Sequence, residues 1–200
     1  ANFLSSGQST RISGVVKVLG PSASGLLADV PGPELLSRVA ALQGDSSELG
    51  EALTALARIA GSTTQAAVDD EYHELFIGVG RGELMPYGSF YLTGFAYEKP
   101  LARLRDDMAR LGIARAEHVK EPEDHIASLC EIMAGLIDGA FGAAADLADQ
   151  RAFYDAHLGP WAARFFADLE AAKAANFYMP VGRVGRIFMD IESTAFEMAA

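Results

Sequence analysis

Apolar side chains recur every three or four positions over most of the chain, which is the spacing of one buried face of an α-helix. The clearest such run is formed by Ile126, Leu129, Cys130, Met133, Leu136 and Ile137. Pro122 suits the first turn of this helix, and the carboxylates of Glu121 and Asp124 suit the positive end of its dipole. The pattern predicts a capped core helix that begins at Pro122, and it leaves His125 without an assigned role.

The same spacing predicts further helices, most of them bounded by glycine, proline or a capping side chain. They are expected at about residues 34–43, 45–61, 64–76, 100–111, 160–169 and 175–198. In the helix expected at 64–76, the acidic residues are expected on the solvated face: Asp69, Asp70, Glu71 and Glu74. In the last helix we expect Ile191 to be buried, and Gly182 and Gly185 to allow close contact with another helix.

The composition favours an all-α fold, because Ala, Leu and Gly abound whereas Val, Ile and Thr are sparse. We predict a helical bundle over residues 34–200, built as one domain or as two tightly packed helical halves, with a hinge-like connector at about 112–120. Residues 1–33 contain many Gly, Ser and Pro and are expected to form an irregular N-terminal segment.

The net charge of −11 argues against a nucleic-acid partner and suits a basic peptide. No apolar run reaches the roughly 18–20 residues that span a bilayer, and no export signal is recognisable, so we expect a cytoplasmic protein. The single cysteine, Cys130, excludes an internal disulfide and lies in the apolar stripe, where we expect a buried and inert thiol.

Three glycines at alternate positions, Gly78, Gly80 and Gly82, are the first candidate for chemistry. They lack the full spacing of a phosphate-binding loop, follow a helix rather than a strand, and have no Gly-Lys-Ser/Thr. A nucleotide-using enzyme acting through the Gly78–Gly82 loop remains an alternative, and a flexible loop hinge is the favoured interpretation.

Metal-binding and nucleophilic patterns are incomplete. Asp70 and His73 form one Asp-x-x-His, but a carboxylate-bridged site needs a matching set on other helices. Neither Ser89 nor Ser128 lies in a nucleophile elbow that would pair it with His125. We therefore predict no metal and no cofactor, and no set of these residues supports a catalytic mechanism.

A long aromatic segment, residues 78–94, has no helical period and is expected to be a functional loop. Its aromatic side chains, together with the acidic stretch before His125, suit an apolar groove with a negative rim for a peptide that is basic at one end. The equally weighted alternative is that these aromatics fill the core beneath the loop.

Two motifs in this order resemble the signatures of the TorD/DmsD/NarJ chaperones of redox-enzyme maturation, nearest the TorD/DmsD branch. The first is Tyr72-x-x-Leu75-Phe76-x-Gly78 followed by Pro86-Tyr87-x-Ser89-x-Tyr91-Leu92, and the second is Glu121-Pro122-x-Asp124-His125 with Met133 downstream. The resemblance covers about residues 34–198. Residues 5–33 depart from it, because they contain no tyrosine and no amphipathic helical period, by divergence or by a shifted reading frame.

The resemblance implies an all-helical cytoplasmic chaperone, and not an enzyme. Such a chaperone binds the twin-arginine leader and the apo form of a molybdenum-cofactor oxidoreductase. Such chaperones delay export until the cofactor is inserted. The leader-binding residues that it implies are Tyr72, Leu75, Phe76, Pro86, Tyr87, Asp124 and His125, with Glu121 and Pro122 as structural members of the second motif. Asp124, where ionised and accessible, would pair with a leader arginine.

Two further points stay open. An assembly factor for a membrane nitrate reductase is an alternative that the Pro86-Tyr87 pair disfavours. The oligomeric state is a monomer or a domain-swapped dimer, and dimethyl sulfoxide, trimethylamine N-oxide and formate enzymes all remain candidate clients.

Overall fold

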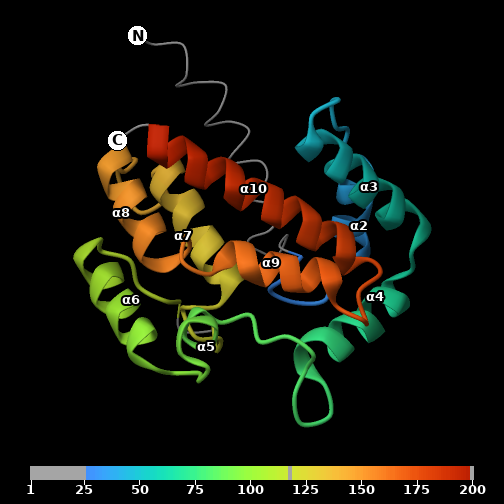
Figure 1. Cartoon of the computed structure of the whole chain (residues 1–200), viewed down its shortest axis with the longest axis horizontal. Coiled ribbons are helices and arrows are strands. Elements are labelled where there is room, and N and C mark those ends of the chain that lie inside the picture. The colour runs from blue at the N-terminus through green and yellow to red at the C-terminus, as the bar shows by residue number, and fades with distance from the viewer. Residues whose placement is uncertain (1–25, 117–118, 199–200) are drawn as a thin grey trace. The chain divides into compact units, whose positions relative to one another are not determined.

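The computed structural model describes residues 26–116 and 119–198, and every regular element in these ranges is a helix (Figure 1). The elements are α2 (Pro33–Ala40), α3 (Glu48–Ser62), α4 (Gln65–Tyr72) with a π-helical turn at His73–Ile77, α5 (Gly88–Thr93), α6 (Lys99–Arg110), α7 (Ile126–Asp138), α8 (Leu147–His157), α9 (Ala162–Ala171) and α10 (Tyr178–Met198). The all-α prediction is confirmed. The expected irregular segment 1–33 lies largely outside the described residues.

The helices fall into two compact units. In the described ranges, unit 1 comprises residues 26–28, 87–116 and 119–160, and unit 2 comprises residues 29–86 and 161–198. The chain therefore crosses from unit 2 into unit 1 between Pro86 and Tyr87, and returns between Pro160 and Trp161. The hinge-like role of residues 112–120 stays a prediction, and those of them that are described belong to unit 1.

Unit 1 is built from α5 to α8, and α7 supplies its most buried helix. Nine of the thirteen residues of α7 are buried, Cys130 among them. Burial raises the pKa of the Cys130 thiol to about 12, as expected for an inert side chain. The Asp107 carboxylate of α6 contacts the imidazole Nε2 of His157 in α8 at 2.7 Å, which joins these two helices.

The predicted start of α7 at Pro122 is wrong, because the helix begins at Ile126 with His125 as its N-cap. The carbonyl of Pro122 accepts the N–H of His125 at 3.1 Å, so residues 122–125 form a turn before the helix. The predicted loop 78–94 is also partly helical, since α5 occupies Gly88–Thr93. Its first N–H groups, at Gly88 and Ser89, are bound by Asp124, a partner too distant in sequence for periodicity to reveal.

Unit 2 contains α2 to α4, the π-helical turn, α9 and α10. A Cβ added at Gly182 would lie 2.4 Å from the backbone N of Glu170, and one at Gly185 would lie 2.2 Å from Cδ1 of Phe166. The close approach of α10 to α9 therefore requires both glycines, as predicted. Ile191, expected to be buried, is 43% exposed.

Capping side chains explain where two helices of unit 2, α3 and α4, begin. Ser47 accepts the N–H of Gly50 at the start of α3, and Thr64 accepts the N–H of Ala67 at the start of α4. Across the described ranges, no helix has the length and apolar character needed to cross a lipid bilayer.

Candidate peptide-binding site

The second sequence motif and the start of the aromatic segment meet in unit 1, in what we call the motif cluster: Tyr87, Ser89, Glu121, Asp124 and His125. The Tyr87 hydroxyl donates to the Glu121 carboxylate at 2.6 Å. Its ring stands edge-on to the His125 imidazole, with centroids 5.2 Å apart and planes at 74°. The backbones of Tyr87 and His125 also form an isolated antiparallel bridge. Two side-chain contacts and one backbone contact thus hold the half-buried Tyr87 in place.

His125 is buried and caps α7. Its Nδ1 accepts the N–H of Ala127 at 3.2 Å, so the ring proton of the neutral imidazole belongs on Nε2. Burial lowers the pKa of His125 to about 4, against the opposing influence of the Glu121 and Asp124 carboxylates. A protonated ring would lose the cap and place a positive charge at the positive end of the helix dipole, so the site is built for neutral histidine.

Asp124 is only 3% exposed and connects α7 to α5. Its Oδ2 accepts the N–H of Ser89 at 2.7 Å, and its backbone carbonyl accepts the N–H of Gly88 at 2.9 Å. Its Oδ1 is buried and has no hydrogen-bond partner among the described residues. The accessibility that a direct pairing of Asp124 with a leader arginine requires is absent from this structure, and the side chain positions α5 instead.

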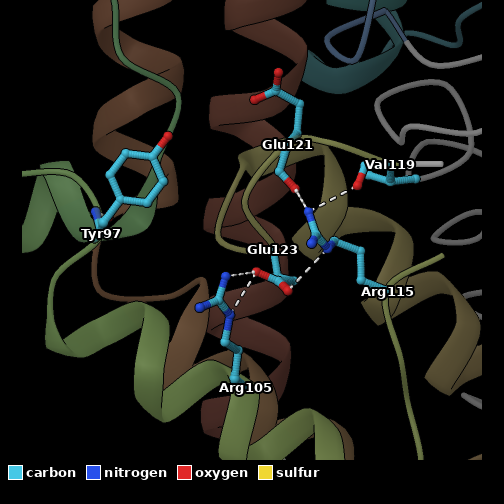
Figure 2. Close-up of polar contacts among 7 residues, drawn as sticks. Tyr97, Arg105, Arg115, Val119, Glu121 and Glu123 are labelled. Carbon is cyan, nitrogen blue, oxygen red and sulfur yellow. Dashed lines mark hydrogen bonds and ion pairs between the residues drawn. The ribbon is translucent and has the colours of Figure 1, made fainter. Parts of the chain in front are cut away.

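Glu123, which lies between Glu121 and Asp124 in the second motif, organises a network of arginines (Figure 2). Arg105 of α6 donates to its Oε2 from Nε and Nη2 at 3.0 and 2.8 Å, and Arg115 Nε lies 3.4 Å from its Oε1. Burial opposes ionisation of Glu123, but the bonds from Arg105 and the charge of Arg115 outweigh it and hold the pKa of this carboxyl below its usual value. Arg115 also donates to the backbone carbonyls of Val119 and Glu121 at 2.9 and 3.4 Å. These bonds fix the backbone that leads into the second motif.

The first motif forms a separate aromatic cluster in unit 2: Tyr72, Phe76 and Tyr178. Ring centroids are 5.1 Å apart for Tyr72 and Phe76, and 5.4 Å apart for Phe76 and Tyr178, which meet edge to face. Tyr72 and Phe76 are half-buried, whereas Tyr178 is fully buried. Burial raises the pKa of the Tyr178 phenol, so it remains neutral.

Glu71 supports this aromatic cluster, contrary to its expected place on a solvated face. Its carboxylate is 9% exposed and accepts the backbone N–H groups of Asn176, Phe177 and Tyr178 at 2.7–2.9 Å. These are the free donors at the start of α10, so Glu71 caps that helix from α4. A sequence signal existed, because Glu71 stands three residues after the buried Val68 and four before the buried Leu75.

The alternative chemistries gain no support from the geometry. The Gly78–Gly82 loop closes back on the π-helical turn through the bond from Gly78 N–H to the His73 carbonyl at 2.6 Å, with Gly78 at φ 59° and Gly80 at φ 89°. His73 is exposed and contacts Asp69 on its own helix at 3.1 Å. Within residues 26–116 and 119–198, no group of three or more His, Cys, Asp or Glu side chains could hold a metal ion.

The seven predicted leader-binding residues are therefore divided between the units. Unit 2 holds Tyr72, Leu75, Phe76 and Pro86, and unit 1 holds Tyr87, Asp124 and His125. Only the three aromatic residues Tyr72, Phe76 and Tyr87 are half-exposed, and the other four are buried. Pattern analysis of the sequence did not predict the supporting roles of Glu71, Ser89 and Tyr178, although Ser89 stands in the first motif.

Comparison with known proteins identifies the family. Residues 42–167 match the family model described as nitrate reductase delta subunit. The match spans more than half of the chain, so the protein belongs to this family, which confirms the TorD/DmsD/NarJ resemblance of its motifs.

The relatives are chaperones. The chaperone protein TorD of Vibrio cholerae serotype O1 (strain O395) is 26% identical over 162 residues, covering 77% of this chain and 74% of its own length. The TorD chaperone of Vibrio atlanticus (strain LGP32) is 23% identical over 137 residues, with 64% of each chain covered. The family is one of chaperones and not of enzymes, in line with the prediction.

A solved structure shares the fold. The crystal structure of a protein described as a redox enzyme maturation protein from Archaeoglobus fulgidus matches with a TM-score of 0.57 at 21% identity. The match covers 94% of this chain and 96% of the other. The likeness extends over both units taken along the chain.

Proposed function

We propose that this protein is a cytoplasmic maturation chaperone that binds the twin-arginine leader and the apo form of a molybdenum-cofactor oxidoreductase. In this role it delays export of its client until the molybdenum cofactor has been inserted. The observation that carries the proposal is membership in a family whose relatives are TorD chaperones, with both family motifs present. The net charge of −11 suits a partner with a basic leader.

The half-exposed aromatic side chains are the proposed contacts to the leader. Tyr72 and Phe76 form one apolar patch on unit 2, and Tyr87 forms another on unit 1. Aromatic rings supply large apolar contact area with few rotatable bonds, which suits the apolar part of a leader. Leu75, Pro86 and His125 are buried, and His125 packs edge-on against the Tyr87 ring.

Glu121 is the proposed partner of a leader arginine. Its side chain is exposed, whereas Asp124 is buried, and it already accepts the Tyr87 hydroxyl at 2.6 Å. A guanidinium beside this carboxylate would lie next to the Tyr87 ring, where a charge-assisted bond and an apolar contact can form together. Asp124 then acts through α5, by holding the N–H groups of Gly88 and Ser89.

Calorimetric titration with the leader of a molybdoenzyme encoded near this gene tests the proposal. We expect micromolar or tighter binding by the wild type, and about tenfold weaker binding by Glu121→Gln and Tyr87→Ala. Asp106→Asn, at an exposed position of α6, is the matched charge control and should bind as the wild type does. Absence of binding to every such leader would overturn the proposal.

The family description favours a second candidate, a cytoplasmic assembly factor for a membrane nitrate reductase. Such a factor would bind its client without a twin-arginine leader. Titration with the N-terminal peptide of a nitrate reductase catalytic subunit, beside the leader peptide, separates the two, because the first proposal requires preference for the peptide that contains the arginine pair.

A further inference from the structure

Unit 1 exposes a short aromatic segment, residues 92–97, which we call the aromatic strap; only its first residue, Leu92, belongs to a motif. It joins α5 to α6 and exposes Leu92 by 42%, Phe95 by 69% and Tyr97 by 74%. The other large apolar side chains exposed on the described part of unit 1, Phe141 and Leu147, lie six positions apart in a separate stretch of the chain. Clustered exposed aromatic side chains often mark interaction sites, because the exposure of apolar surface to water is unfavourable until a partner covers it.

Hydrogen bonds fix the backbone of the strap. The Thr93 hydroxyl donates to the Ser89 carbonyl at 2.8 Å and accepts the N–H of Phe95 at 3.2 Å. Gly94 turns the chain at φ 82° and donates its N–H to the Phe90 carbonyl at 2.8 Å. The exposed rings therefore project from a turn whose backbone is already ordered, so a ligand that binds them loses little free energy in ordering the segment.

The backbone of Tyr97 has an unfavourable conformation that a neighbouring side chain stabilises. It has φ 63°, a left-handed conformation that costs a non-glycine residue about 1 kcal/mol or more. The buried Ser89 hydroxyl accepts its backbone N–H at 3.2 Å and stabilises this conformation. Figure 2 shows the Tyr97 ring projecting from the chain at this position.

The strap is connected directly to the second motif. Asp124 binds the N–H of Ser89, and Ser89 binds the N–H of Tyr97, so the buried acid of the motif sets the position of the exposed ring through one intermediate residue. The buried Asp124 carboxylate can therefore influence the strap without being exposed itself.

We propose that the aromatic strap binds the apolar stretch of the leader peptide, with Phe95 and Tyr97 as its main contacts. The inference rests on the proposed function and adds a site to it. Two features favour this occupant over a second copy of the chain. Each copy carries a net charge of −11, which opposes self-association, and the exposed Glu121 carboxylate of the motif cluster suits the basic end of a leader.

The test is a double-mutant cycle between protein and peptide, measured by fluorescence anisotropy. The protein variants are Phe95→Ser combined with Tyr97→Ser, and Tyr97→Gly alone. The peptides are a leader and the same leader with serines in its apolar stretch. Leu147→Ser, at an exposed apolar position of α8 in the same unit, is the matched control.

We expect the double variant to bind the natural leader at least tenfold more weakly, and the serine-substituted leader less than twofold more weakly than the wild type does. Tyr97→Gly removes the ring and also the left-handed strain, so it should lose affinity while keeping or gaining thermal stability. Leu147→Ser should leave both affinities unchanged.

Unchanged binding of the natural leader by the double variant would overturn this inference and leave the proposed function standing. An equal loss for both peptides would also overturn it, because the strap would then not read the apolar stretch. Wild-type protein that binds no leader would overturn the proposed function and this inference with it. Sedimentation showing a wild-type dimer that the double variant abolishes would assign the strap to self-association and overturn the inference in that way.

Discussion

The carboxylate of Glu71 accepts the backbone N–H of Tyr178 at 2.7 Å, although the two residues stand 107 positions apart in the sequence. The same carboxylate binds the two preceding N–H groups, so one side chain of α4 closes the start of α10. The Tyr178 ring is thereby held against Phe76, one of the proposed leader contacts. The helix cap and the candidate binding patch of unit 2 depend on one another.

We expect Glu71→Gln to lower the free energy of unfolding by about 2 kcal/mol, because it removes the negative charge that serves three N–H donors and the helix dipole. Urea unfolding followed by circular dichroism measures the change. Glu74→Gln, at an exposed position of the following π-helical turn, should change stability by less than about 0.5 kcal/mol. Equal stability of the two variants would show that the cap contributes nothing.

The lowered pKa of His125 leads us to expect that the free energy of unfolding falls in acid. Its pKa is about 4 in the folded protein, below the ordinary 6.5, so between these values the unfolded chain binds a proton that the folded protein does not. The stabilisation is complete above pH 6.5 and is lost as the pH falls toward 4, up to about 3 kcal/mol.

The variant His125→Asn keeps a capping side chain for α7 but cannot titrate. Chemical unfolding at pH 7 and at pH 5 should show the wild type losing about 2 kcal/mol more than this variant over that interval. Parallel losses for both proteins would mean that His125 is not the responsible group.

Glu192 has the opposite pH dependence. It lies buried on α10 with Oε1 unpaired among the described residues, and burial raises its pKa to about 7. The folded protein therefore keeps a proton that the unfolded chain releases near pH 4.5, and stability contributed by this group falls as the pH rises from 4.5 to 7.

Glu192→Gln should accordingly be more stable than the wild type at pH 8, by up to about 3 kcal/mol, and nearly equal to it at pH 4.5. Glu197→Gln, at an exposed position of the same helix, is the control and should match the wild type at both values. A wild type that is the more stable protein at pH 8 would contradict the assignment.

The contact between α9 and α10 gives a prediction about packing. A methyl group at Gly185 would overlap the Phe166 ring, so we expect Gly185→Ala to cost about 2 kcal/mol or more in thermal or urea unfolding. Gly61→Ala, in the last turn of α3, meets only Ala40 at an ordinary 3.7 Å and should stabilise the protein by about 0.5 kcal/mol. Destabilisation by both variants alike would mean that space at Gly185 is not the deciding factor.

Sequence periodicity was sufficient for the long helices, because their buried faces repeat over several turns and their ends carry local signals such as Ser47 and Thr64. It failed at the start of α7. Pro122 and its acidic neighbours have the composition of a first helical turn, but they form a turn that precedes α7. In this turn the Asp124 carboxylate accepts the N–H of Ser89 in α5, 35 positions away in the sequence. A local pattern cannot contain such a partner.

The candidate site was predicted in part for a similar reason. The motifs gave the residues that meet around Tyr87 and around Phe76, yet they did not distinguish exposed side chains from supporting ones. Asp124 proves to be buried and Glu121 exposed. Phe95 and Tyr97 lie in the segment where Gly94 and Tyr97 itself have positive φ, and the Ser89 hydroxyl, eight positions before Tyr97, accepts the Tyr97 N–H. Hydropathy contains neither feature.

The most direct test of the chaperone role is quantitative co-purification of a molybdoenzyme precursor with this protein, comparing the intact precursor with one that lacks its leader. The proposed function predicts that the intact apo precursor is recovered in a stable complex, and that deletion of the leader reduces recovery at least tenfold. Equal recovery of both precursors, or recovery of neither from a cell that makes the client, would contradict it.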